Sequence, residues 1–322
     1  MNTPDDAQLP PALMAGWRFR AVIWSVVVAA LGYLGFAIWS GWTEVVAAVQ
    51  HVGWWGVAVA LGLSLINYAL RFARWQLYLG AMGHRIAAWP SWKIYLAGFA
   101  LTTTPGKAGE ALRGMLLKPL GVPYTRSLAA FLSERLSDLL AVVALTLFGL
   151  SLYPGSRPLV LVGAVAVGAG LLMLSHPQWL KTIRQWLPPS GRLAGLLHRL
   201  LNVLDEARAC HRPGLLLSAT VLSLMAWTAE AWAFDLILRW MGWELPLAFA
   251  VFVYAIGMLA GALSFMPGGL GGAEIAMVTL LTWRGIPMPQ ALAATLLIRL
   301  ATLWFAVALG AVFLSGYRAR PQ

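Results

Sequence analysis

Long apolar runs, separated by short polar segments, make up most of this chain. A helix needs about 20 apolar residues to cross the hydrocarbon core of a bilayer. On that basis we predict about six full spans, which lie near residues 20–40, 53–80, 125–150, 158–175, 214–238 and 288–314. The pattern therefore predicts an all-α polytopic membrane protein.

Two further apolar regions, 91–119 and 246–284, are each broken by a Pro-Gly pair. The pieces of the first region are short for a crossing, so we predict a re-entrant hairpin there. In the second region the piece 246–264 is long enough to cross and the piece 273–283 is short, so a crossing and a hairpin both remain open. Together with the full spans, this gives about eight to ten helical segments in the membrane.

Two stretches of the chain, about half its length apart, have nearly the same sequence. Residues 121–136 read GVPYTRSLAAFLSERL and residues 285–300 read GIPMPQALAATLLIRL. Upstream of each stretch, a Pro-Gly break precedes a glutamate: the residues are Pro105, Gly106, Gly109 and Glu110 in the first copy, and Pro267, Gly268, Gly269, Gly271 and Glu274 in the second. Chance similarity between apolar helices is the alternative, but the shared Gly-x-Pro, Arg and Glu positions favour a duplication.

The similarity extends further upstream, where Met82-Gly83 has a counterpart in Met241-Gly242. We therefore predict two repeats, 63–150 and 222–314, inside a single transmembrane domain that covers residues 1–322. Each repeat consists of a span, a broken hairpin and a second span.

Basic residues are concentrated on one side of the predicted spans. The loops 41–52, 151–157 and 239–245 hold only Arg157 and Arg239, while the other loops and the two ends of the chain are rich in Lys and Arg. Because positive residues are retained in the cytoplasm, we predict cytoplasmic N- and C-termini in a bacterial cytoplasmic (inner) membrane. The first spans of the two repeats then run in opposite directions, so the repeats are inverted.

Composition supports this interpretation and excludes several classes. Of the 322 residues, 60% are hydrophobic and 11% are charged, and the mean hydropathy is +0.74. The net charge of +11 belongs to the cytoplasmic loops, and no basic stretch is long enough for a nucleic-acid-binding module, so we expect no nucleic acid partner. The single Cys210 excludes an intrachain disulfide, and the histidines fall in loops or at span ends. We expect no metal site and no cofactor.

The segment 178–212 places charges at helical spacing between leucines. This pattern predicts an amphipathic helix on the cytoplasmic membrane surface. Docking onto a separate lipid synthase is the alternative role for this segment.

Charged residues inside the predicted spans carry the functional prediction, because each costs about 2.5–3.5 kcal/mol at the bilayer centre. The cations would form a binding site for an anionic lipid head group: Arg71, Arg74, Lys107, Arg113, Arg135 and Arg299. The two Pro-Gly breaks would add helix N-termini, which favour anions. The buried acids would supply counter-charge or carry protons: Glu110, Glu134, Asp138, Glu230 and Glu274.

The same charges could also have purely structural roles. Glu134 and Asp138 share a helix face while Arg135 points aside, and Arg135 would then pair with Glu230 or Glu274 only to fix helix register. Arg71, Arg74 and Asp235 could extend to the membrane surface instead of lying in a site.

These residues form an ordered series of motifs: Arg71-x-x-Arg74-Trp75, Pro105-Gly106-x-x-Gly109-Glu110-x-x-Arg113, Glu134-Arg135-x-x-Asp138 and Pro267-Gly268-Gly269-x-Gly271-x-x-Glu274, with Arg299 last. In this order the series resembles the membrane domain of the lysyl-phosphatidylglycerol synthase/flippase family, from about residue 20 to residue 315. The resemblance implies a protein that moves lipids between leaflets. The chain ends at Gln322 without a soluble aminoacyl-transferase domain, so lysine transfer to lipid is not expected.

The function that we expect is a lipid translocase that moves an anionic phospholipid between leaflets by alternating access, and we do not expect an enzyme. A transporter that recycles a polyprenyl-phosphate carrier is an alternative within the same class. A membrane enzyme for lipid phosphates, with Glu134 and Asp138 as acid and base, is an alternative from another class. A third is a non-transporting partner that docks through 178–212.

Overall fold

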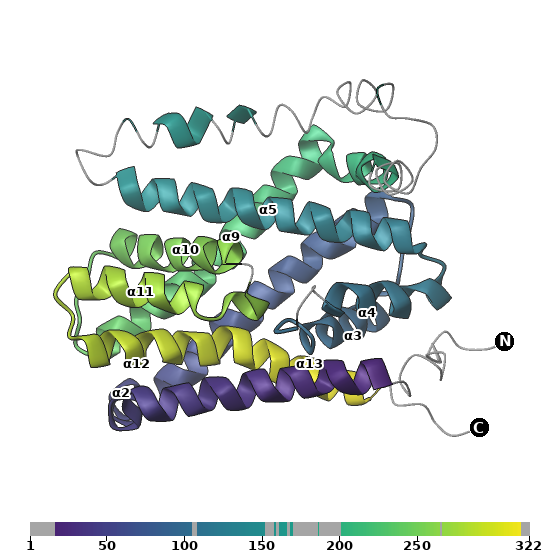
Figure 1. Cartoon of the computed structure of the whole chain (residues 1–322). Helices are drawn as coiled ribbons and strands as arrows, with labels where there is room; N and C mark the ends of the chain where they lie inside the picture. Colours follow the sequence, from purple (N-terminus) through teal and green to yellow (C-terminus); the bar gives the residue numbers. More distant parts are fainter. Residues whose placement is uncertain are drawn as a thin grey trace.

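A computed structural model describes residues 17–104, 108–151, 201–264 and 266–316, together with residues 158, 161–165, 168–169 and 186. The described residues form helices joined by short turns, with no strand among them, and this confirms the all-α prediction (Figure 1). Most of the predicted span 158–175 and of the amphipathic segment 178–212 lies outside the described residues. The end of that segment is helical at 201–207 and in the short η4 (Arg208–His211).

The first helix, α2 (Trp17–Ala81), contains both of the first two predicted spans. Gly53 separates them, because its φ of 67° lies in the left-handed region that favours glycine. Figure 1 shows the two arms of α2 running in different directions. The neighbouring Trp54 and Trp55 are 85% and 79% exposed, as is typical of tryptophans at a membrane interface.

The remaining helices form two series with the same order. The second arm of α2 (residues 54–81) is followed by α3 (Ala88–Phe99), α4 (Ala108–Leu117), the short η2 (Lys118–Leu120) and α5 (Tyr124–Ser151). The second series begins with α9 (Pro213–Trp240), α10 (Leu247–Leu263), the short η5 (Pro267–Gly269) and α11 (Gly272–Trp283). It ends with α12 (Met288–Arg299), a π-turn at Leu300–Trp304 and α13 (Phe305–Ser315). These elements fall largely within the predicted repeat ranges 63–150 and 222–314.

Three of the described helical segments are long and apolar enough to cross a membrane: Val45–Ala81, Pro213–Trp240 and Met288–Ser315. Helix α5 has 28 residues, the same length as the second of these, but it carries the charges of Glu134, Arg135 and Asp138. The core therefore combines apolar spans with one long helix that brings charge into it.

Helices α3, α4 and α11 have 12, 10 and 12 residues, or about 18, 15 and 18 Å, so they are too short to cross a hydrocarbon core of about 30 Å. Helix α10 has 17 residues, or about 26 Å, which is at the lower limit for a crossing. The members of each pair pack closely, since a Cβ on Gly109 would lie 2.3 Å from the Gly98 carbonyl oxygen and one on Gly272 2.9 Å from the Ala260 carbonyl oxygen. Both broken regions therefore form packed helix pairs, and Figure 1 shows α10 and α11 side by side next to α5.

The two series share their turns as well as their helices. At the end of the second arm of α2, Gly83 (φ 86°) donates to the Gly80 carbonyl and His84 to that of Leu79. At the end of α9 the same turn recurs, with Gly242 (φ 86°) donating to Arg239 and Trp243 to Leu238. The equivalent glycines before α5 and α12, Gly121 and Gly285, also have positive φ.

Contacts between the two series are reciprocal. Asn67 Nδ2 donates to the carbonyl of Ala226 at 2.8 Å, and these residues are 159 positions apart, as are Gly83 and Gly242. Tyr68 Oη donates to the carbonyl of Thr302 on the second series, and its counterpart Trp227 donates to Asp138, the counterpart of Thr302. A contact between equivalent residues places an approximate twofold axis at the Asn67–Ala226 crossing.

The second arm of α2 and α9 are antiparallel across this axis. The start of the arm lies at the end of α9, where a Cβ on Gly56 would lie 2.8 Å from the Trp240 ring. At the other end, Arg126 of α5 donates to the Met82 carbonyl and contacts Glu206, just before α9. Because the second arm of α2 and α9 are antiparallel, the twofold axis that relates them runs perpendicular to both helices. This is the geometry of an inverted repeat.

Candidate functional site

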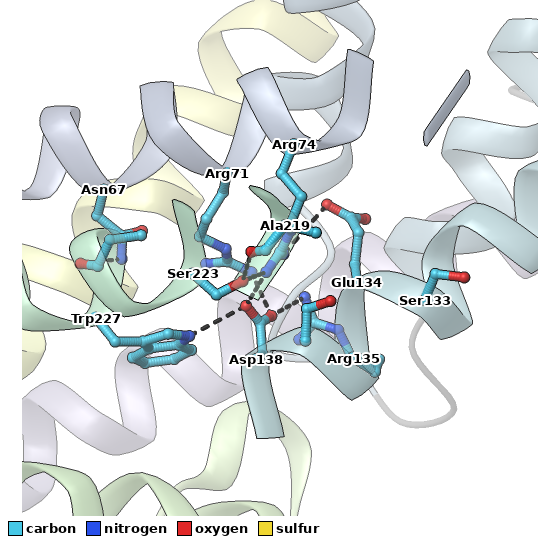
Figure 2. Close-up of polar contacts among 12 residues, drawn as sticks. Asn67, Arg71, Arg74, Ser133, Glu134, Arg135, Asp138, Ala219, Ser223 and Trp227 are labelled. Atoms are coloured by element: carbon cyan, nitrogen blue, oxygen red, sulfur yellow. Dashed lines mark hydrogen bonds and ion pairs between the residues drawn. The ribbon is translucent and has the colours of Figure 1, made fainter. Parts of the chain in front are cut away.

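Six charged side chains gather where α2, α4, α5 and α9 meet, and Figure 2 labels those that come from α2 and α5. We call them the arginine cluster: Arg71, Arg74, Arg113, Glu134, Arg135 and Asp138. Helical periodicity accounts for the arrangement, because residues three or four apart lie on the same helix face. Arg71 and Arg74 thus point together from α2, and Glu134 and Asp138 point together from α5.

Asp138 is the centre of the arginine cluster. Its carboxylate accepts from Arg74 Nη1 at 2.7 Å, and lies 3.0 Å from Arg135 Nη2 and 3.5 Å from Arg71 Nη2. Trp227 Nε1 of α9 donates to it at 3.1 Å. Arg74 also donates to the Ser223 hydroxyl, so α9 contributes two contacts to a site formed mainly by α2 and α5.

Glu134 is the second carboxylate of the arginine cluster, and it contacts Arg113 and Arg74. Its Oε2 lies 2.9 Å from Arg113 Nη1, and its Oε1 lies 3.7 Å from Arg74 Nη2 and accepts from Tyr95 Oη at 3.4 Å. The guanidinium of Arg113 lies 4.9 Å from the ring centroids of both Trp75 and Tyr95. Aromatic faces stabilise a cation by their quadrupole, which offsets part of the cost of removing Arg113 from water.

The arginine cluster carries more positive than negative charge. Among the side chains that the structure describes here, four arginines face two carboxylates, an excess of two positive charges. The side chains of Arg74 and Glu134 are fully buried, while those of Arg71 and Arg135 are 12% and 35% exposed and form an open edge. The Nε atoms of Arg71 and Arg135 are buried and lack a hydrogen-bond partner among the described residues. The partly exposed guanidinium groups of these two arginines are suited to bind the oxygens of a phosphate.

Arg299, which the sequence places in the same head-group site, lies in a second cluster. Its Nε donates to Glu274 at 2.8 Å and its Nη2 donates to the Gly268 carbonyl at 2.7 Å. Gly268 precedes α11, and Glu274 lies in the first turn of that helix. The structure thus divides the predicted cations between two places, with Arg135 and Arg299 at equivalent positions of the two series.

The structure corrects several expectations about single residues. Arg135 does not point aside from Asp138 but contacts it, and Glu274 pairs with Arg299 instead of Arg135. Arg74 does not extend to the surface, because its side chain is fully buried. Asp235 pairs with Arg239 of its own helix at 2.7 Å.

Four predicted site residues are not placed. Pro105, Gly106 and Lys107 lie outside the described residues, and so does the side chain of Glu110. Gly109 is placed, and it contributes the close approach of α4 to α3.

Sequence reasoning missed the hydrogen-bonding neighbours of the charges. Tyr95 reaches Glu134, and Tyr254 Oη donates to Glu230 at 2.6 Å. The repeat offset was the available signal, because Tyr95 and Tyr254 are 159 positions apart, like Asn67 and Ala226. Trp227, which donates a hydrogen bond to Asp138, is another such neighbour. No tryptophan is expected at the site from the sequence, since most tryptophans of a membrane protein lie at interfaces.

Comparison with known proteins agrees with the membrane architecture. Residues 22–310 match the family described as the lysylphosphatidylglycerol synthase TM region. A UPF0104 membrane protein of Methanothermobacter thermautotrophicus is 28% identical over 302 residues, covering 88% of this chain and 90% of that protein. A second UPF0104 membrane protein of the same organism is 22% identical over 282 residues, covering 79% of this chain and 83% of that protein. This chain therefore belongs to the lysylphosphatidylglycerol synthase transmembrane-region family of membrane proteins.

Proposed function

We propose that the protein is a lipid translocase, which moves an anionic phospholipid between the leaflets of the cytoplasmic membrane by alternating access. The observation that carries this proposal is the excess of positive charge in the arginine cluster, inside a bundle of apolar helices. A buried charge is costly in a membrane, and an excess of buried positive charge is costlier still. The phosphodiester of an anionic phospholipid would offset one of these two positive charges, while a zwitterionic or neutral head group would add no net negative charge.

The open edge of the arginine cluster is where the head group would bind. Arg71 and Arg135 contact Asp138 at 3.5 and 3.0 Å, and both are partly exposed. A phosphate between them would compete with Asp138 for the same guanidinium groups. Asp138 would keep its shortest contact, with the fully buried Arg74, so the cluster would hold together during the exchange.

The approximate twofold relation supplies the second part of the proposal. Arg299 is the counterpart of Arg135 on the other side of the Asn67–Ala226 crossing, so a head group released from the arginine cluster would next meet Arg299. Inverted repeats with a site at their interface are the architecture by which many transporters alternate access. The family match adds a lipid-related context.

The geometry bears differently on the three alternatives. A polyprenyl phosphate offers the same phosphate chemistry, so it would use the same arginines and differs only in its tail. An enzyme with Glu134 and Asp138 as acid and base receives no support from the observed contacts, because both carboxylates already accept from arginines. Docking to a synthase depends on 178–212, which is mostly outside the described residues.

The test is transbilayer movement of tail-labelled phosphatidylglycerol, phosphatidylcholine and polyprenyl phosphate in proteoliposomes. Arg71→Gln and Arg135→Gln should each slow the movement of the anionic substrate by about tenfold or more, since a charge-assisted hydrogen bond contributes about 1.5–3 kcal/mol. Asp138 keeps Arg74 in both variants, so we expect them to fold. Arg239→Gln is the matched control, because Arg239 forms a partly exposed pair with Asp235 away from the arginine cluster.

Three results would count against the proposal. Movement no faster than in protein-free liposomes would exclude a translocase. Equal movement of phosphatidylcholine would exclude selection of an anionic head group. Wild-type rates in both cluster variants would show that translocation does not use this site.

A further inference from the structure

Glu230 differs from the other buried acids of the protein. The described residues include five buried carboxylates: Glu134, Asp138, Glu230, Asp235 and Glu274. Four of them have an arginine nitrogen within 4.0 Å, and Glu230 has neither an arginine nor a lysine nitrogen within that distance in the described part of the chain. Its hydrogen bond comes from a neutral group, the Tyr254 hydroxyl, at 2.6 Å. An ionised carboxylate in this environment would be an uncompensated charge in the bundle.

Glu230 is within electrostatic range of both arginine sites. Every helix packed against this part of α9 contributes a polar or charged neighbour: Tyr68 and Arg71 from α2, Asp138 from α5, Tyr254 from α10 and Arg299 from α12. Arg71 belongs to the arginine cluster, Arg299 belongs to the second cluster, and both act electrostatically on Glu230. The charge state of Glu230 therefore affects the electrostatic environment of both arginine sites.

The counterpart of Glu230 in the first series of helices is Arg71. Arg71 and Glu230 are 159 positions apart, as are Asn67 and Ala226 at the crossing, so they occupy equivalent sites in the two series. Each lies one helical turn beyond the crossing, on opposite sides of the twofold axis, because the two helices are antiparallel. The first series thus places a fixed cation where the second series places a group that can be negative or neutral.

We propose that the charge state of Glu230 gates the passage of the phosphate head group between the arginine cluster and Arg299. This inference rests on the translocase function proposed above. In the neutral form Glu230 does not oppose the phosphate. In the ionised form it repels the phosphate and competes for Arg71 and Arg299.

The passage opens when one proton binds to a carboxylate oxygen of Glu230, and it closes when that proton leaves. Tyr254 keeps its own proton and turns its hydroxyl between donating to the carboxylate and accepting from the neutral acid. No bond other than that of the carried proton is made or broken. Movement of an anionic lipid should therefore be faster at lower pH.

The test compares pH profiles of phosphatidylglycerol movement in proteoliposomes for the full-length protein. Wild type should speed up by about fivefold or more between about pH 8 and about pH 5.5, because a single protonation controls the step. Glu230→Gln mimics the neutral acid, so its rate should stay near the fast acid value of wild type across this range. Asp235→Asn, a buried acid of the same helix that already has an arginine, should keep the wild-type profile.

The outcomes separate the two proposals. A wild type that moves no lipid contradicts the translocase function itself. A wild type that moves lipid with the same pH profile as Glu230→Gln overturns the role of Glu230 alone. Infrared spectroscopy of the purified protein gives an independent measurement: wild type and Asp235→Asn should show a protonated-carboxyl band at neutral pH that is missing from Glu230→Gln. Absence of that band from wild type would also overturn the inference.

Discussion

Arg74 shows at the residue scale how the protein holds charge inside a membrane. Its guanidinium has no exposed area, and it contacts Asp138, Glu134 and Ser223 on two other helices. Removing one partner of a buried pair leaves a bare charge, which costs about 3–5 kcal/mol, whereas replacing both partners by apolar residues is often nearly neutral. Contacts of this kind fix which helices meet at the site.

The sequence predicted which residues carry charge but not how they pair. Residue type and helical spacing were enough to bring Arg71 and Arg74 to one face and Glu134 and Asp138 to another. Pairing depends on rotamers and on the approach of other helices, which no local pattern contains. This is why Arg135 was wrongly expected to point aside, and why the Glu274–Arg299 pair was only one of several open options.

The Arg299–Glu274 pair gives the prediction at this scale. Arg299→Met and Glu274→Leu should each lower the free energy of unfolding by about 3–5 kcal/mol, and the double variant should be more stable than the sum of the two losses predicts. Thermal unfolding in detergent measures both. Strictly additive losses would show that the 2.8 Å contact does not couple the two side chains energetically.

At the scale of elements, the helix breaks were the most predictable feature. The second Pro-Gly pair and both Gly-x-Pro motifs lie between helices, as the sequence predicted, and α3 with α4 and α10 with α11 form packed pairs. Two details had no sequence signal. Helix α2 continues through the predicted loop 41–52 to Gly53, and the last span contains a π-turn at Leu300–Trp304, directly after Arg299.

Close packing of α13 on α3 gives the prediction at this scale. A Cβ on Gly310 would lie 2.1 Å from the backbone nitrogen of Ala100, and backbone cannot turn aside as a side chain can. Gly310→Ala should therefore lower stability by about 1–3 kcal/mol, measured by thermal unfolding. Gly62→Ala is the control: Gly62 is also helical, but its Cβ position is open, so alanine should leave stability unchanged or raise it by up to about 1 kcal/mol. Equal melting temperatures of both variants would show that α13 does not pack this tightly on α3.

At the scale of the whole molecule, the two series of helices are alike in backbone but different in charge. The same glycine turns and the reciprocal Tyr68–Thr302 and Trp227–Asp138 contacts relate them. The first series contributes four arginines to one cluster, while the second contributes Arg299 with a single acid partner. The repeat was readable from sequence, and so was its charge asymmetry. The crossing at Asn67–Ala226, which puts the two sites on opposite sides of one axis, required the folded molecule.

The central claim is that the arginine cluster holds an anionic lipid head group. Native mass spectrometry of the purified protein tests it most directly, with wild type compared with the Arg71→Gln/Arg135→Gln double variant and the Arg239→Gln control. The account predicts that wild type and the control retain anionic lipid and that the double variant loses it. Equal retention of anionic lipid by all three proteins, or retention of only zwitterionic lipid by wild type, would contradict the account.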